Sequence, residues 1–168
     1  MPPHNPHHTN HPHHPHANQW NGPQPAPRAL WALVHANFPQ TRFDGIYNQR
    51  NIAGTNTPSL HAEGRALDIG LSASKPTEKT IGDGLFQAFI DVAAEMGVEE
   101  VIWNRRIWST RNPHIHAYHG HSPHTDHVHV GFTRAASQRT SFPNSLQVKI
   151  GQLRTGLEDL SKAFSNVG

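Results

Sequence analysis

The segment HVHVGF at residues 127–132 alternates polar and apolar side chains, and this alternation constrains the fold more than any other feature. Successive side chains of a β-strand point to opposite faces, so the pattern predicts a half-buried strand with Val128 and Val130 in the core. His127 and His129 then share the other face. Two neighbouring imidazoles are costly to bury unless they share a metal ion or hydrogen bonds, so we expect this face to line a cleft.

A second set of polar side chains lies in SLHAEGRALDIG, residues 59–70. On one straight strand, the odd separation of His61 and Asp68 would place them on opposite faces. Gly64 permits a bend between them, so both could aim at one point. With an imidazole from the alternating strand they form a set that suits zinc and leaves a fourth position for water. Asp126, just before that strand, supplies a carboxylate that can take a proton from this water.

The chain has no cysteine and sixteen histidines. Without cysteine, a disulfide framework and a thiolate zinc site are both excluded, so any metal ion must be held by imidazole and carboxylate. The formal net charge is +2, and no run of Lys or Arg marks a nucleic-acid or membrane surface. No apolar run reaches membrane-spanning length, and the N-terminus lacks the pattern of a Sec signal peptide. We therefore expect neither a nucleic-acid partner nor membrane insertion.

Composition divides the chain into three parts. Residues 1–27 are rich in His, Pro and Asn and have almost no apolar side chains, so we predict a disordered tail. Its seven histidines could bind metal weakly, although a solubilising or packaging tail, or a purification artefact, is the simpler interpretation. A folded domain is predicted over residues 28–134. A linker and an amphipathic C-terminal helix are predicted over residues 135–168.

Helices and strands follow one another in mixed order through the folded part. Apolar residues at helical spacing predict helices over 27–38, 83–96 and 146–164. Strands are predicted over 65–71, 98–103, 106–108 and 127–132, with a short strand or turn over 43–47 and a long His-rich loop before residue 127. Asn104 and Arg105 are predicted to form a hairpin turn. This mixture indicates an α+β fold, a small antiparallel sheet with flanking helices.

The pattern S-x-H-x-x-G-x-A-x-D, followed later by a short acidic and His-rich strand, resembles the LAS-type zinc metallopeptidases. That superfamily contains D-Ala-D-Ala carboxypeptidases and dipeptidases, phage L-Ala-D-Glu endopeptidases and the hedgehog signalling domain. The resemblance extends over residues 50–132 and omits both the tail and the C-terminal helix. It is carried by Ser59, His61, Gly64, Ala66, Asp68, His124, Asp126, His127 and His129.

This resemblance implies a hedgehog- or DD-peptidase-like fold and one zinc ion per chain. The implied ligands are His61, Asp68 and His129. The family places a catalytic carboxylate three residues before the last ligand, where Asp126 stands, and further catalytic histidines match His127 and His124. Some members hold a substrate carboxylate with an upstream arginine, a role that Arg50 or Arg42 could fill.

Ser59 is interpreted as support for the His61 loop and as a candidate substrate contact, because no nucleophile motif surrounds it. Carboxypeptidase members often carry a Glu and a Trp in the last motif, and the absence of both here argues against exopeptidase action. The NRRIWST segment resembles a branch of wall-associated hydrolases. Residues 28–134 are thus expected to form a zinc peptidase domain.

The expected function is zinc-dependent hydrolysis of stem or cross-link peptides in bacterial peptidoglycan, by an endopeptidase or a carboxypeptidase. Such an enzyme would act in the periplasm or the cell wall. Without a visible signal peptide, a phage lysis system or a contractile injection machine could deliver it as a lysin or an effector. Two alternatives stay open, a non-catalytic zinc module like the hedgehog domain and a His-rich metal-binding protein.

Overall fold

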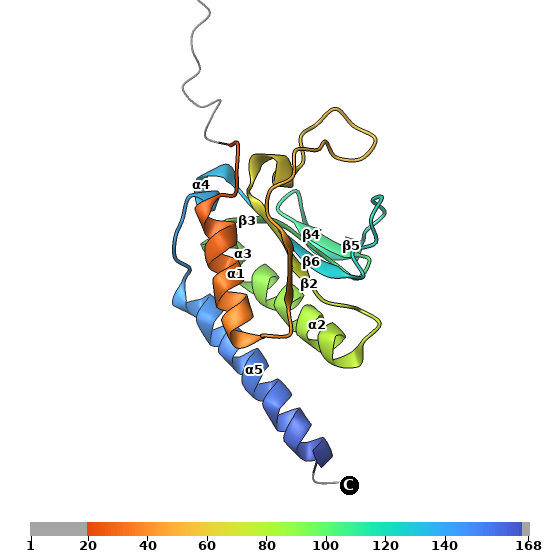
Figure 1. Cartoon of the computed structure of the whole chain (residues 1–168), viewed down its shortest axis with the longest axis vertical. Coiled ribbons are helices and arrows are strands. Elements are labelled where there is room, and N and C mark those ends of the chain that lie inside the picture. Colours follow the sequence, from red (N-terminus) through yellow and green to blue (C-terminus); the bar gives the residue numbers. More distant parts are fainter. Residues whose placement is uncertain (1–19, 166–168) are drawn as a thin grey trace, which may run out of the picture.

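A six-stranded sheet forms the centre of the molecule in a computed structural model that describes residues 20–165 (Figure 1). The strands lie in the order β1-β2-β6-β3-β4-β5, and each neighbouring pair is antiparallel. They are β1 (Arg42–Gly45), β2 (Ala66–Gly70), β3 (Val98–Trp103), β4 (Arg106–Ser109), β5 (Asn112–Ala117) and β6 (His127–Phe132). The predicted α+β fold with a small antiparallel sheet is confirmed.

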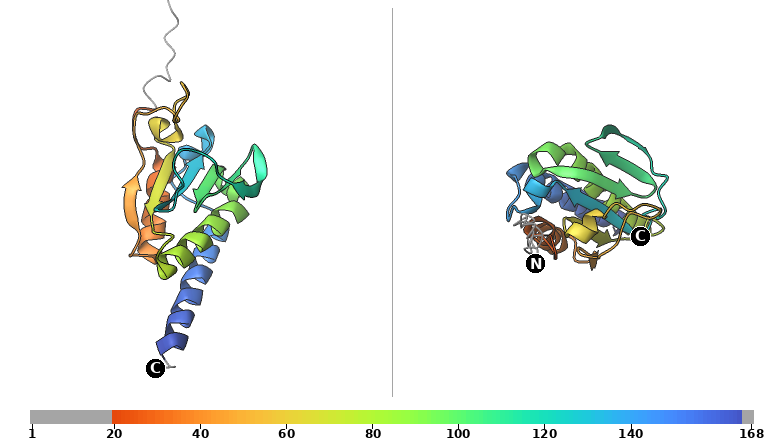
Figure 2. Two further views of the ribbon diagram at one scale, coloured as in Figure 1. Left: turned by 90° about the vertical axis from the view of Figure 1, so that its right-hand side faces the viewer. Right: turned by 90° about the horizontal axis from the view of Figure 1, so that it is seen from above.

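Helices flank this sheet. They are α1 (Pro25–Asn37), α2 (Pro76–Asp91), α3 (Ala93–Met96), α4 (Arg134–Ser137) and α5 (Asn144–Ser165), together with the short 3-10 helix η1 (Leu60–Glu63). α1 and α2 pack against the central strands, while α5 packs on α1 and α2 and extends past the sheet (Figures 1 and 2). Within the described residues, no helix combines the length and the apolar character that a membrane span requires.

The core lies between the central strands and these helices. Val128, Val130 and Phe132 of β6 are completely buried there, as the alternation in the sequence predicts. The same core includes Leu67 and Ile69 of β2, Val101 and Trp103 of β3, Leu30 and Val34 of α1, and Phe86 and Phe89 of α2. Burial of apolar surface contributes about 25 cal/mol per Å². The polar side chains that alternate with these residues therefore occupy the opposite face of the sheet.

The hairpin between β3 and β4 confirms the predicted turn. Asn104 and Arg105 have φ angles of 46° and 64°, so both central residues are left-handed. A two-residue turn of this kind matches the right-handed twist of the strands that it joins. Asn adopts the left-handed region readily, whereas Arg seldom does. The hairpin closes at the pair Trp103–Arg106.

Two helices begin earlier than the sequence patterns predict. α1 starts at Pro25, and Gln24 before it is buried and donates its backbone N–H to the carbonyl of Gly64 over 2.9 Å. Residues 25–27 therefore form the first turn of a helix and are not part of a disordered tail. Residues 1–19 of the expected tail lie outside the described residues. α2 starts at Pro76 and ends at Asp91, before α3, instead of spanning 83–96.

The early start of α2 has a simple cause. Proline suits the first turn of a helix, where its missing N–H costs nothing. The turn that follows contains Thr77, Glu78 and Lys79, so it presents no apolar stripe from which a helix can be predicted. Gly97, with a φ angle of 70°, ends α3 at Met96, the residue at which the sequence predicts a helix to end.

The sequence predicts a loop where β5 lies, and this prediction is wrong. It is an edge strand of the described sheet, next to β4, and all of its residues are exposed. A strand with both faces open has no buried face to impose alternation, so its His-rich sequence carries no strand signal. Further along the chain, α4 lies within the predicted linker, and Leu146 and Ile150 bury one side of α5.

Candidate metal centre

The pairing of β2 with β6 brings two of the predicted ligands together. Asp68 lies directly opposite His129 in this antiparallel pair, so both side chains point to the sheet face away from the core. His61 reaches the same point from η1. One candidate ligand atom from each of these three residues lies within 4.8 Å of the other two. The group could therefore bind a metal ion.

Gly64 makes the turn from η1 into β2 that the motif predicts. Its φ angle is 66°, and its backbone N–H caps η1 by bonding to the carbonyls of His61 and Leu60. A Cβ atom at this position would lie 1.8 Å from the carbonyl oxygen of Gly22. Glycine is required here by both the backbone conformation and the close approach.

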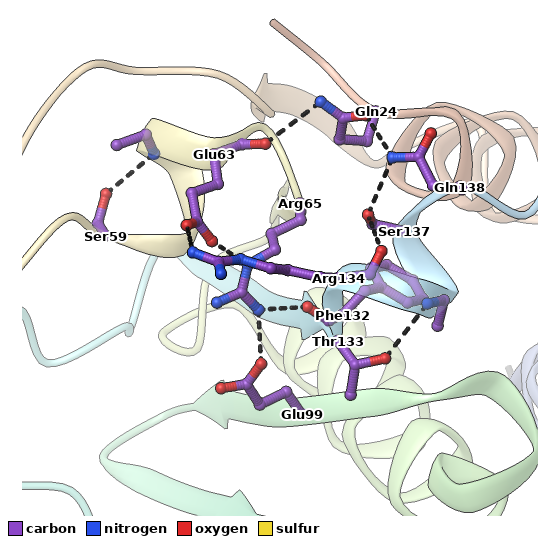
Figure 3. Close-up of polar contacts among 12 residues, drawn as sticks. Gln24, Ser59, Glu63, Arg65, Glu99, Phe132, Thr133, Arg134, Ser137 and Gln138 are labelled. Carbon is purple, nitrogen blue, oxygen red and sulfur yellow. Dashed lines mark hydrogen bonds and ion pairs between the residues drawn. The ribbon is translucent and has the colours of Figure 1, made fainter. Parts of the chain in front are cut away.

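Polar contacts anchor η1 on both sides (Figure 3). The hydroxyl of Ser59 accepts a hydrogen bond from the backbone N–H of Ala62 over 3.2 Å, which is the supporting role predicted for it. The carboxylate of Glu63 pairs with Arg65 and with Arg134 of α4 (Figure 3). Sequence reasoning gave Glu63 no part in the site, because its partner Arg134 becomes a neighbour only in the folded chain.

Arg65 is the centre of that network. Its guanidinium is largely buried and also bonds to the carboxylate of Glu99 at 2.5 Å and to the carbonyl of Phe132 (Figure 3). It thereby ties the start of β2 to β3 and β6. Removing one partner of such a buried pair leaves the others uncompensated, which is strongly destabilising. The network holds η1, and with it His61, at a fixed place above the sheet.

The two candidate imidazole ligands face each other through different nitrogens. His61 donates from Nδ1 to the carbonyl of Ile46 over 2.9 Å, so its Nε2 faces the group. This Nε2 lies 3.2 Å from Asp68 Oδ1 and 3.2 Å from His129 Nδ1. His129 Nδ1 lies 2.8 Å from Asp68 Oδ1, and its Nε2 lies 3.2 Å from Glu100 Oε1.

The imidazole of His129 lies between the carboxylates of Asp68 and Glu100 and is positively charged. Burial by itself would lower the pKa of His129, but the hydrogen bonds to Asp68 and Glu100 outweigh it and raise the pKa to about 10. Burial would likewise raise the pKa of Asp68, yet its hydrogen bonds with His129 and His61 hold it well below the usual range. At neutral pH both carboxylates are ionised around a positive charge, which a divalent cation can replace.

His127 also belongs to this cluster. Its Nε2 lies 3.8 Å from Asp68 Oδ1, while its Nδ1 donates to the carboxylate of Asp126 over 2.8 Å. The Asp126 side chain itself is 77% exposed. Asp126 is therefore connected to the group through His127, whereas His127 points a ring nitrogen at Asp68.

His124 lies beside His127 and His129. Its ring centre lies 4.6 Å from that of His127 and 5.7 Å from that of His129, and Tyr118 packs edge-on against it. Burial lowers the pKa of His124 to about 4, so the ring is neutral at pH 7. Its Nδ1–H donates to the carbonyl of Ser122 over 2.8 Å, which leaves Nε2 as an acceptor only.

The candidate substrate residues lie around this cluster with different partners. Arg50 is exposed, and its backbone carbonyl accepts from Ser59 over 3.0 Å. The charge of Arg50 counteracts the burial that raises the pKa of Tyr118, so the two side chains share one electrostatic neighbourhood. Arg42 instead bonds to Glu78 and to the carbonyl of Asp126, each at 3.4 Å.

Sequence reasoning missed Glu100 and Tyr118. Glu100 stands in VEEVIW and faces His129 because β3 pairs with β6 in the register Ile102–His129. The sequence does not contain that register, so nothing in it distinguishes Glu100 from its neighbour Glu99. Tyr118 follows the edge strand β5, and its approach to His124 depends on the return of the chain after residue 120.

Comparison with known proteins gives one match. The sequence model of the family described as VldE, C-terminal domain, matches residues 19–129. The matched region contains His61 and Asp68, and its last residue is His129. No curated protein and no solved structure matches the chain.

Proposed function

The chain belongs to the VldE C-terminal domain family, and we propose that it is a zinc-dependent hydrolase of peptide bonds in bacterial peptidoglycan. The observation that carries this proposal is the convergence of His61, Asp68 and His129 on one point, with His127 beside them. Its motifs, with their resemblance to LAS-type metallopeptidases, supply the substrate class.

The donor set fits zinc. Two imidazole nitrogens and one carboxylate oxygen are donors that zinc prefers, and three protein ligands leave one coordination position free for chemistry. Each imidazole bonds through its other nitrogen to an oxygen, His61 to a carbonyl and His129 to a carboxylate, which is the usual environment of histidine ligands. When bound, zinc supplies Lewis-acid polarisation of a carbonyl and activation of water.

His127, supported by Asp126, is the proposed acceptor of the proton that the attacking water loses. Because Nδ1–H of His127 is held by the Asp126 carboxylate, Nε2 carries the lone pair and faces Asp68. His127 is thus the group that takes a proton and later returns it to the leaving amine. The carboxylate of Asp126 stabilises the imidazolium that forms, so the two residues act as one unit.

His124 positions water and does not stabilise an oxyanion. A neutral ring whose Nδ1–H is bound to Ser122 can only accept at Nε2, so it can orient a water hydrogen. Arg50 is the proposed residue for holding a carboxylate of the peptide substrate, since Arg42 is bound to Glu78. The hydroxyl of Ser59 caps η1, so its contribution is to the loop of His61.

Two observations favour this proposal over its alternatives. The hydrogen-bonded pair of Asp126 and His127 lies beside the candidate ligands, where a zinc hydrolase needs a proton acceptor and a non-catalytic zinc module does not. Among the residues that the structure describes, His61, Asp68 and His129 are the only group of three that could hold a metal ion, which favours a single metal centre within that part of the chain. A phage lysis system or a contractile injection machine is the proposed route to the wall.

Digestion of purified peptidoglycan, followed by mass spectrometry of the released fragments, tests the function. We expect new amino and carboxyl termini within stem or cross-link peptides, no fragments after removal of metal by a chelator, and recovery on addition of zinc. The variant Asp68→Ala serves as the inactive control. An unchanged peptidoglycan profile with zinc-loaded protein would refute the proposed substrate.

A further inference from the structure

We propose that Glu100 is a positioning residue that makes Nδ1, and not Nε2, the metal-facing nitrogen of His129. This inference rests on the metal centre of the proposed function. Glu100 occurs in none of the motifs that point to the site, and the contact between its Oε1 and His129 Nε2 over 3.2 Å carries the argument.

A neutral imidazole has one N–H and one lone pair, and the partner of the N–H decides which nitrogen can bind a metal. The carboxylate of Glu100 only accepts, so it holds the proton on Nε2. When the ring loses its second proton to bind a metal, Nδ1 therefore offers the lone pair toward the point where Asp68 Oδ1 and His61 Nε2 lie, at 2.8 and 3.2 Å. The ring of His129 stands between Glu100 and the other two ligands, which makes Glu100 a support for a ligand and not a fourth ligand.

The sheet register brings Glu100 to this place. Ile102 is paired with His129 and Glu100 with Gly131, so the side chains of Glu100 and His129 share one face on neighbouring strands. Gly131 leaves the space that Glu100 needs. A Cβ atom there would lie 3.3 Å from Glu100 Cγ and 2.2 Å from Cδ1 of Leu60, the residue before His61.

The alternative role for Glu100 is that of an ordinary charge that stabilises the fold. Burial would raise its pKa, but the hydrogen bond and the charge of His129, together with the charge of Arg65, lower it. Its side chain is 30% exposed, and its hydrogen-bond partner among the described residues is the ring of His129. The substitution Glu100→Gln separates an orienting role from a purely electrostatic one. The amide oxygen of glutamine still accepts a hydrogen bond, so orientation of the ring is kept, whereas the negative charge is gone.

Zinc titration of the full chain with Glu100→Ala and Glu100→Gln tests the proposal, with Glu158→Ala on the exposed side of α5 as the matched control. Loss of an outer-shell partner typically costs about 10- to 100-fold in metal affinity. We expect Glu100→Ala to bind zinc at the tight site about 10- to 100-fold more weakly than the wild type. Glu100→Gln should stay close to the wild type, and Glu158→Ala should equal it.

Nitrogen-15 spectra of labelled histidines in the zinc-loaded proteins give the second readout. The wild type and Glu100→Gln should show His129 with a protonated Nε2 and a metal-bound Nδ1, whereas Glu100→Ala should lose this single pattern. Tight binding through Nδ1 in Glu100→Ala would overturn the proposal, and so would an equal loss in both variants. Neither readout uses peptidoglycan, so a protein that binds zinc as described but hydrolyses nothing would refute the function and leave this inference standing.

Discussion

His127 donates from Nδ1 to the carboxylate of Asp126 over 2.8 Å and presents its Nε2 toward the metal group. The motifs imply that Asp126 is the catalytic carboxylate. In the structure it is His127 that faces the candidate ligands, and the carboxylate of Asp126 holds its ring. The carboxylate of Asp126 is largely exposed. We therefore propose that the ring of His127, and not the carboxylate of Asp126, takes the proton.

Variants of these two residues should differ in their effect. We expect His127→Ala to lose about 100- to 10,000-fold in the rate of peptidoglycan hydrolysis, because it removes the general base. Asp126→Ala should lose less, because the ring stays in place. Both should retain tight zinc, and His119→Ala, on an exposed part of the chain, should match the wild type. A nearly inactive Asp126→Ala beside an active His127→Ala would return the base role to Asp126.

Metal binding should release a proton at neutral pH. The raised pKa of His129, about 10, means that the metal-free ring is charged at pH 7 and must lose one proton to coordinate. Zinc affinity should therefore increase with pH up to about 10. Calorimetric titration at pH 7 in two buffers of different ionisation enthalpy should give about one proton released per zinc. Release of none would show that His129 is neutral before the metal binds.

The same charged ring affects the stability of the metal-free protein. A raised folded-state pKa contributes stability that is fully present below the unfolded value of about 6.5 and is lost as the pH rises through the folded value. The contribution of His129 should thus disappear as the pH approaches about 10. Zinc-loaded protein should not show this loss, because its His129 is already unprotonated at Nδ1.

Two glycine-to-alanine changes should have opposite effects on stability. Alanine normally stabilises a helix by about 0.5–1 kcal/mol over glycine. Gly82 in α2, however, touches Trp103, and a Cβ atom there would lie 2.4 Å from the indole ring. Gly82→Ala should lower the free energy of unfolding by about 1–3 kcal/mol through overpacking. Gly156→Ala in α5 meets no atom within 4 Å and should raise it. Urea unfolding measures both, and a stabilised Gly82→Ala would contradict the packing around Trp103.

Particular residues show how far the sequence predicts this fold and site. The alternation in residues 127–132 predicts β6, because a strand with one buried face imposes a period of two. The choice of His129 as a ligand rests on the resemblance to LAS-type metallopeptidases, whereas the bend at Gly64 and a ligand set of His61, Asp68 and one imidazole of this strand follow from spacing and donor chemistry. These features depend on local rules, so one sequence is enough to find them.

Other features depend on the folded chain. Glu100 and Glu99 are equivalent in the sequence, and the register of β3 with β6 alone separates a partner of His129 from a partner of Arg65. The strand β5 has no buried face, and the first turn of α2 is polar, so neither produces a periodic pattern. The hydrogen bond between Asp126 and His127 depends on how the two side chains are oriented, and the sequence does not contain that orientation.

The zinc content of the purified chain tests the central claim most directly. Wild-type protein and the variants His61→Ala, Asp68→Ala and His129→Ala are dialysed against a weak chelator, and the metal is counted by elemental analysis. We predict one tightly held zinc ion per wild-type chain and almost none in each variant, because each loses one of three ligands. Full occupancy in the variants, or several tightly held ions per wild-type chain, would contradict a single metal centre formed by these residues.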